Sequence, residues 1–371
     1  MVCIHADLFQ ILRGYASLVP PSRLQFPSHL QTQVIHDFLV DHILSNLHFQ
    51  TYPPSVDYQR SFWKWIIPLL EKTVALDPET EVDSRIYDVY LELLHSSTGP
   101  EAVPGLTGRR PPSQAYITHF WRQDGLAKST LVDLDEYQTT TILESRTMIE
   151  SGTTGLRTWL ASLILAQYLI LNPGADFSSS VKEYSNSVLE PAFWEVLSLP
   201  CSSWNAAQAQ VHSGCQISTT LFSPAAVIMS TCIATDLSSS HPNTNCCFLD
   251  WSAALDPDGI EPLTSLLNDQ IDPDVILGAD IVFDPDLIPP LVAVLRLALQ
   301  ANTRSRSALI ALTTRNPTTM TKFTDAVQDT GLILKKLDFE IQDQMFIESL
   351  ECTGDTNNGV GIFMISSSVE Q

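Results

Sequence analysis

The amino-acid sequence predicts an α/β protein in which a small helical domain precedes a domain built on a sheet. Apolar residues in the first part of the chain recur at the three-to-four spacing of amphipathic helices, whereas later parts alternate β-rich runs with helical segments. A stretch rich in proline and glycine, residues 98–113, lies between the two patterns. We therefore expect a helical domain over residues 1–105 and an α/β domain over residues 106–371.

In the first domain, three segments show the apolar spacing of helices: residues 30–44, 62–70 and 84–94. Four histidines accompany this region: His29, His36, His42 and His48. Their spacings of seven, six and six residues place them on drifting helix faces. We therefore expect solvated or partly packed side chains there and no metal site.

In the second domain, β-rich runs and helical patterns alternate and end in an extended pair, which is typical of a doubly wound sheet. Such a sheet binds its ligand beyond the carboxyl ends of the strands. The expected strands are residues 116–121 and 139–143, as a hairpin, and 274–279, 307–313, 332–341 and 359–366. The expected helices are residues 153–171, 285–300 and 316–329.

The composition restricts the partners. Lys and Arg number 20 against 42 Asp and Glu, so the net charge is −22 and repels nucleic-acid phosphates and anionic membranes. No apolar run reaches the roughly 18 residues of a membrane span, and the seven cysteines show no paired metal spacing. We expect a cytoplasmic monomer with a protein partner, without nucleic acid, membrane or metal.

Several runs resemble the seven-β-strand protein-lysine methyltransferases. Residues 152–159, GTTGLRTW, enter a predicted helix; residues 249–251 are LDW; residues 276–285, ILGADIVFDP, carry an acid followed shortly by an aromatic residue. In the first domain, residues 52–62, YPPSVDYQRSF, are similar to the helical domain of the eukaryotic elongation factor 2 lysine methyltransferases. The resemblance covers most of the chain outside residues 172–247.

This resemblance implies a Rossmann-like sheet of seven strands with an antiparallel last pair. It also implies S-adenosylmethionine as cofactor, lysine methylation as the reaction and elongation factor 2 as the protein partner. The residues at cofactor-contacting positions are Trp159, Asp250, Trp251 and Ala279. The residues facing the substrate lysine, and thus the catalytic candidates, are Asp280 and Phe283.

Those residue types suit the chemistry. Apolar and aromatic surfaces can cover a flat adenine. A lysine must lose its proton before it attacks a methyl group, and with a pKa of about 10.4 this costs about 4.6 kcal/mol at pH 7. Asp280 can recruit the ammonium and then orient the amine, while Phe283 can wall the channel. In a plainer interpretation, Trp159 packs a helix onto the sheet, Asp280 is an acid near a helix N-terminus, and Phe283 belongs to the core.

The chain departs from the family where a glycine-rich loop should follow the first core strand. Residues 187–190 resemble the strand's end, but residues 191–195, PAFWE, follow. Read two bases later, the codons for residues 191–196 encode a residue that can be glycine, an apolar residue, leucine, glycine, and serine or glycine. A reading-frame or splicing error over residues 172–247 is therefore one hypothesis, a divergent loop another. We interpret residues 314–316, TRN, as a turn and helix cap.

Three alternatives to an active protein-lysine methyltransferase follow. A non-catalytic relative could use the helical domain and the acidic surface to hold a partner. A small-amine methyltransferase would leave the first domain without an obvious use. An NAD-dependent oxidoreductase is disfavoured because the phosphate-binding glycines are missing.

Overall fold

The computed structural model divides the chain into two compact units, Met1–Thr147 with Gln344–Leu350, and Met148–Asp343 with Glu351–Gln371. The described residues are 2–75, 81–95, 114–144, 158–172, 218–222, 226–231, 244–247, 249–271, 273–282, 284–300, 306–339, 345–346 and 359–367.

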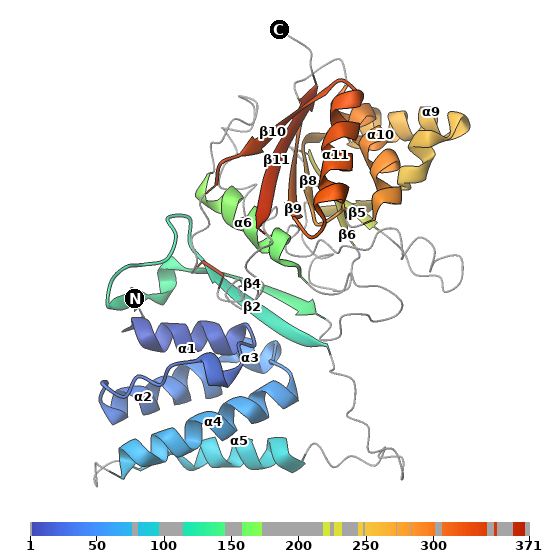
Figure 1. Cartoon of the computed structure of the whole chain (residues 1–371). Coiled ribbons are helices and arrows are strands. Elements are labelled where there is room, and N and C mark those ends of the chain that lie inside the picture. Colours follow the sequence, from blue (N-terminus) through green and yellow to red (C-terminus); the bar gives the residue numbers. More distant parts are fainter. Residues whose placement is uncertain are drawn as a thin grey trace. The chain divides into compact units, whose positions relative to one another are not determined.

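The first unit is mainly helical (Figure 1). Its helices are α1 (Ala6–Ala16), α2 (Thr32–Phe38), which continues as a π-helical segment over Leu39–Leu44, α3 (Leu47–Thr51), α4 (Val56–Val74) and α5 (Ser84–His95). Their apolar faces share one core, in which Phe62 and Trp63 of α4 are almost completely buried. The helices expected at residues 30–44, 62–70 and 84–94 are thus confirmed.

The described part of this unit also contains two antiparallel strand pairs. Strand β1 (Cys3–His5) pairs with β3 (Leu131–Asp133), and β2 (Ala115–Trp121) pairs with β4 (Gln138–Glu144), as the hairpin expected from the sequence.

The contacts group these strands with the helices and divide the chain after Thr147, whereas the sequence suggested a division after residue 105. The physical reason is shared apolar packing. The ring of Phe9 in α1 contacts Phe120 of β2 at 5.8 Å and Tyr137, just before β4, at 4.6 Å between centroids.

The described residues 345–346 also belong to the first unit. The guanidinium of Arg13 is buried, and its Nη2 donates to the carbonyl of Met345 at 2.6 Å. The ring of Phe346 meets that of His119 edge-on, with 5.6 Å between centroids. A late part of the chain therefore supplies an acceptor to a buried cation near the N-terminus.

The second unit holds a mixed sheet of strand order β10-β11-β9-β8-β6-β5-β7. The strands are β5 (Ser218–Phe222), β6 (Ala226–Thr231), β7 (Thr244–Cys247), β8 (Pro273–Ala279), β9 (Ser307–Thr313), β10 (Leu332–Leu337) and β11 (Val360–Ser367). Neighbours β6, β8 and β9 are parallel. Strand β11 is antiparallel to β9 and β10, and β5 is antiparallel to β6 and β7. The α/β class is confirmed, and β5 runs against the direction that a doubly wound sheet requires.

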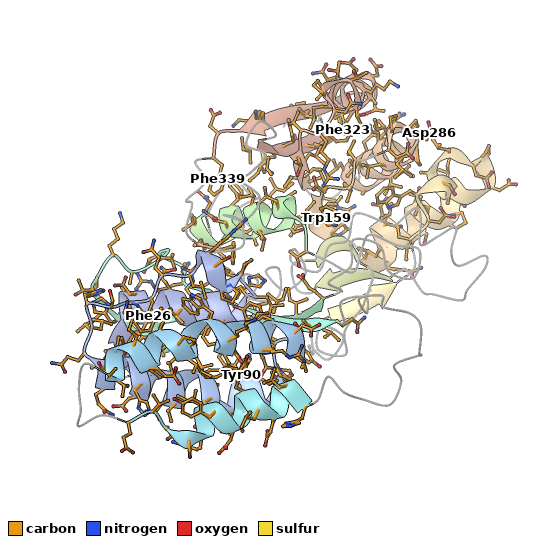
Figure 2. The ribbon with its side chains drawn as sticks, turned by 60° about the horizontal axis from the view of Figure 1, so that its bottom comes forward. Phe26, Tyr90, Trp159, Asp286, Phe323 and Phe339 are labelled. Carbon is orange, nitrogen blue, oxygen red and sulfur yellow. The ribbon has the colours of Figure 1, made fainter. Side chains whose placement is uncertain are left out.

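Helices cover both faces of this sheet (Figure 1). Helix α6 (Leu160–Leu171) contacts β8, β9 and β11 on one face of the sheet. On the opposite face, α10 (Ile288–Leu299) and α11 (Pro317–Asp329) pack against each other and against the sheet. Phe323 of α11 is fully buried in that core (Figure 2). Helix α9 (Pro257–Ser265) precedes β8. Within the described residues, no helix is both long and apolar enough to span a membrane.

His48 connects α3 to the strand pair β2–β4 in the first unit. Its Nε2 lies 3.0 Å from Oγ1 of Thr118 and 2.8 Å from Oγ1 of Thr141, and the two hydroxyls are 2.9 Å apart. Burial lowers the pKa of His48. The folded protein therefore favours the neutral imidazole more than the unfolded chain does.

We expect this histidine to contribute stability that is present above its unfolded pKa of about 6.5 and is lost as the pH falls towards its lower folded pKa. His48→Gln should therefore reduce the loss of thermal stability between about pH 7 and pH 5.5. Melting midpoints across this range measure the effect. His95→Gln, at an exposed position, is the control. An unchanged pH dependence in His48→Gln would contradict the prediction.

Gly278 of β8 permits close packing above the sheet. A Cβ at this position would lie 2.6 Å from Cδ1 of Ile281 and 2.9 Å from Cδ1 of Ile310. We expect Gly278→Ala to lower the free energy of unfolding by about 1–3 kcal/mol, because the added methyl overpacks the core. Urea titration measures this loss. Gly359→Ala is the control, since no described atom lies within 4 Å of its Cβ position; equal midpoints for the two variants would refute the explanation.

Candidate functional site

The candidate site lies where the chain leaves β8. Ala279 is paired with Ala311 of β9, and the N–H of the next residue, Asp280, donates to the carbonyl of Ala311 at 2.8 Å. Asp280 has a φ of 50°, in the left-handed region that aspartate tolerates better than most residues. The chain therefore turns at the carboxyl edge of the sheet, the edge at which α/β proteins bind ligands.

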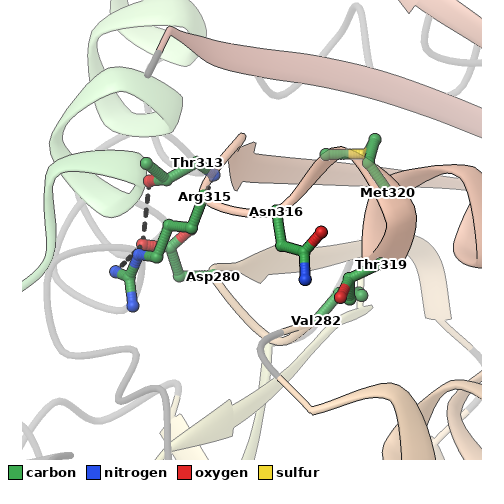
Figure 3. Close-up of a pocket in the computed structure, with 7 residues that line it drawn as sticks. All are labelled: Asp280, Val282, Thr313, Arg315, Asn316, Thr319 and Met320. Carbon is green, nitrogen blue, oxygen red and sulfur yellow. Dashed lines mark hydrogen bonds and ion pairs between the residues drawn. The ribbon is translucent and has the colours of Figure 1, made fainter. Parts of the chain in front are cut away.

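Three donors hold the carboxylate of Asp280 (Figure 3). Its Oδ1 accepts from the backbone N–H of Thr313 at 2.7 Å, and its Oδ2 accepts from Oγ1 of Thr313 at 3.0 Å. The Nη2 of Arg315 donates to the same Oδ2 at 3.0 Å, and the two side chains form an ion pair. The Asp280 side chain is only 6% exposed, so its charge is stabilised by fixed donors and a counter-charge.

Arg315 also contacts a second residue of interest. Its guanidinium carbon lies 4.8 Å from the ring centroid of Trp159, a cation–π distance. Trp159 directly precedes α6 (Figure 2). The indole Nε1 of Trp159 is buried and has no hydrogen-bond partner among the described residues. A buried donor of this kind costs about 1–3 kcal/mol unless an acceptor reaches it, so a bound ligand could stabilise it.

Asp280, Thr313 and Arg315 border a small hollow of about 80 Å³ that opens to solvent. Its lining residues are Asp280, Val282, Thr313, Arg315, Asn316, Thr319 and Met320 (Figure 3). The charged pair lies at one end, while Val282 and Met320 supply apolar wall. The hollow can therefore accept a side chain that combines an alkyl stem with a polar end.

A second, mostly apolar hollow contains Trp251. This residue begins a short helical turn, Trp251–Leu255, and is 7% exposed in the core beneath α10. Ile281 lines the same hollow and directly follows Asp280, so both hollows reach the end of β8. Asp250 is exposed and caps the turn: its Oδ1 accepts from the N–H of Ser252 at 2.9 Å and from its Oγ at 2.7 Å.

The structure brings some of the residues singled out in the sequence together. Asp280 and Trp159 meet through Arg315, with Ala279 adjacent in the strand, whereas Asp250 and Trp251 belong to the second hollow. Phe283 and residues 187–195 lie outside the described part of the chain.

The end of β8 also bears on the plainer interpretation of Asp280 as an acid at a helix N-terminus. Asp284 takes that position, because its Oδ1 accepts from the N–H of Asp286 at 2.9 Å and caps the turn Pro285–Leu287 before α10. Asp280 instead bonds across the sheet to Thr313.

Sequence reasoning missed Arg315. The expected cap is confirmed at Asn316, whose Oδ1 accepts from the N–H of Thr318 at 2.9 Å to begin α11. One signal pointed to Arg315: it follows β9, which is parallel to β8, so their carboxyl ends meet at one edge. A cation after one strand and an acid after its neighbour can therefore pair.

One group of possible metal ligands occurs in the described part of the first unit. Ligand atoms of His5, Asp7 and His29 lie within 4.8 Å of one another. Two short contacts join these three residues. The Nδ1 of His5 accepts from the N–H of Asp7 at 3.2 Å as the cap of α1, and Nε2 of His29 lies 3.2 Å from Oδ2 of Asp7.

Comparison with known proteins gives consistent matches. The model of a family described as lysine methyltransferase matches residues 139–330. The human protein-lysine N-methyltransferase EEF2KMT is 26% identical over 286 residues, which are 76% of this chain and 73% of that protein. The Bos taurus protein of the same name is 26% identical over 352 residues, 88% and 90% of the two chains.

A fungal relative extends the match. The protein-lysine N-methyltransferase EFM3 of Chaetomium thermophilum is 27% identical over 292 residues, which are 78% of this chain and 77% of that protein. Because the family model spans more than half of the chain, the protein belongs to the lysine methyltransferase family and is, by that resemblance, an S-adenosylmethionine-dependent methyltransferase.

Proposed function

We propose that this protein methylates a lysine side chain of elongation factor 2, the substrate that its sequence resemblance implies. The observation that carries the proposal is Asp280: a buried carboxylate at the carboxyl end of β8, in a chain that belongs to a lysine methyltransferase family. The net charge of −22 favours a basic protein surface as the partner.

The sheet supports a Rossmann-like methyltransferase domain. Strands β8 and β9 are parallel, and the antiparallel β11 lies between β9 and β10, as the resemblance implies for the last pair. In such a domain the cofactor and the acceptor meet at the carboxyl ends of the strands, which is the edge where Asp280 and Thr313 bond to each other.

The described residues partly fit S-adenosylmethionine, which when bound supplies a methyl group on a sulfonium sulfur. Trp159 offers a flat ring and a buried N–H that needs an acceptor. Ala279, the last residue of β8, has only a small side chain at the carboxyl edge of the sheet. In the second hollow, Trp251 provides apolar surface suited to an adenine, and the exposed carboxylate of Asp250 can accept from an exocyclic amine.

For the acceptor lysine, the protein must favour the neutral amine. Deprotonation costs about 4.6 kcal/mol at pH 7 for an unperturbed lysine. Asp280 attracts the ammonium into the hollow, but its carboxylate favours the charged amine. Burial and the positive charge of a bound sulfonium favour the neutral form, and they must outweigh the carboxylate before the proton passes to solvent. The reaction is accelerated further when the amine nitrogen is held in line with the methyl carbon and the sulfur of the donor. Phe283 remains a prediction as a residue that lines the path of the substrate lysine.

A second candidate function is a non-catalytic protein that binds a partner. The observation that favours it is the sequence of residues 191–195, PAFWE, where the family's glycine-rich loop is expected. Bulky side chains there would occupy space that the cofactor needs. A partner retained by a protein that binds no cofactor would support this alternative.

We expect Asp280→Asn to lower kcat/KM for methylation of elongation factor 2 by about 100-fold or more, because an amide cannot balance the ammonium charge. Cofactor affinity should stay unchanged. Transfer of a labelled methyl group and calorimetry with S-adenosylmethionine measure the two quantities. Asp286→Asn changes an exposed acid of the same segment and is the control. Unchanged turnover in Asp280→Asn would remove this residue from the site.

A second expectation concerns the missing loop. Replacing residues 191–195 by Gly-Val-Leu-Gly-Ser, one sequence that the alternative frame encodes, should strengthen binding of S-adenosylmethionine by about tenfold or more, or about 1.4 kcal/mol. Calorimetric titration of both chains tests this. Equal affinities would show that the loop sequence does not limit binding, whereas binding by neither chain would favour the non-catalytic candidate.

A further inference from the structure

We infer that Arg315 occupies the place on Asp280 that the substrate ammonium takes, so that an incoming lysine must displace the guanidinium. This inference rests on the proposed function, because it assigns Asp280 to the acceptor. The site described above is then closed to its substrate at rest, and Arg315 regulates entry.

The ion pair supports this exchange. The Oδ2 of Asp280 accepts from Arg315 at 3.0 Å, so the carboxylate already has a counter-cation. A second cation at the same carboxylate would meet like-charge repulsion from the first. An ammonium and the guanidinium therefore compete for Asp280.

Asp280 does not depend on Arg315 for its position. The backbone N–H and the hydroxyl of Thr313 hold the two carboxylate oxygens at 2.7 and 3.0 Å. These bonds come from β9 and can persist when the guanidinium leaves. The acid is therefore preorganised to receive another cation.

Arg315 is placed to move. Its side chain is 45% exposed, against 6% for that of Asp280, and it projects from the turn between β9 and α11. Besides the ion pair, its guanidinium stacks on Trp159 at 4.8 Å. Cation–π contacts and ion pairs at partly exposed positions are weak and are screened by salt. Since Trp159 is a proposed cofactor contact, Arg315 contacts one residue assigned to the cofactor, Trp159, and one assigned to the substrate, Asp280.

The hollow can receive a lysine in its place. Figure 3 shows Asp280 and Arg315 at one end of the hollow and Met320 at the other. Met320 and Val282 offer apolar contact to the methylene groups of a lysine, while Asp280 lies where the ammonium would bind.

The competing explanation keeps Arg315 bound. If it stayed beside the acceptor, its charge would lower the pKa of the lysine and favour the neutral amine. The two explanations differ in whether the contact between Arg315 and Asp280 survives when an alkylammonium ion binds.

The test uses n-butylammonium chloride, which mimics a lysine side chain, with the full-length protein at pH 7 and constant ionic strength. Saturation-transfer NMR measures its affinity. We expect Arg315→Gln to bind it about tenfold more tightly than the natural chain does, because a weak ion pair and a stacking contact no longer compete. Arg315→Lys should give a smaller gain. Asp280→Asn combined with Arg315→Gln should abolish the gain.

The control is Arg296→Gln, which changes an exposed arginine of α10 whose Nε donates to Gln300 at 3.2 Å. It should bind n-butylammonium as the natural chain does. Thermal melting verifies that each variant is folded. No gain in Arg315→Gln, or a gain that persists without the Asp280 charge, would overturn the inference.

A second measurement follows the guanidinium itself. In protein labelled with ¹⁵N-arginine, the resonance that Arg315→Gln removes identifies Arg315. Its hydrogen-bonded Nη signal should disappear as n-butylammonium saturates the site. Persistence of that signal at saturation would support a guanidinium that stays bound and would overturn displacement.

Neither measurement requires cofactor or turnover, so the two proposals can fail separately. Suppose that Arg315→Gln binds n-butylammonium more tightly but methylation does not depend on Asp280. The displacement of Arg315 by an ammonium would then stand, and the proposed role of Asp280 in lysine methylation would be rejected. Methylation that depends on Asp280, together with unchanged ammonium binding in Arg315→Gln, would retain the function and reject the exchange.

Discussion

The hydrogen bonds between Asp280 and Thr313 are the constraint on which the candidate site depends. They join the ends of two parallel strands, and they follow directly from the register that pairs Ala279 with Ala311. A slip of one residue would turn the side chain of Thr313 to the opposite face. The acid would then lose its hydroxyl donor, and Arg315 would emerge at a different position on the edge of the sheet.

Much of the second unit could be predicted because its signals are local. Continuous apolar runs identify β8 and β9, and periodic patterns identify α10 and α11. The short strands β1 and β3 give no such signal, because their pairing depends on contacts between distant parts of the chain. The hairpin β2–β4 was predicted as strands, but its attachment to the helices depends on aromatic contacts that periodicity does not encode.

The candidate site likewise contains residues that local sequence signals identify and residues that only tertiary contacts reveal. Asp280 and Trp159 stand in recognisable motifs, so their residue types and positions could be read from the sequence. Arg315 could be recognised only through its partner, which lies 35 residues earlier and is brought near by strand register. The burial of Trp251 against α10 likewise depends on tertiary packing that the sequence pattern does not show. Trp251 therefore packs in the core in addition to its proposed contact with the cofactor.

The contact between Arg13 and Met345 has a consequence for biosynthesis. The first unit includes residues 344–350, so a ribosome that has finished Thr147 has not yet made the carbonyl of Met345, which accepts from this buried guanidinium. At about 5–20 residues per second, the missing segment emerges roughly 10–40 s later. The N-terminal helices therefore lack this acceptor while nearly all of the following sheet is translated, and a fragment truncated after residue 147 would lack it permanently.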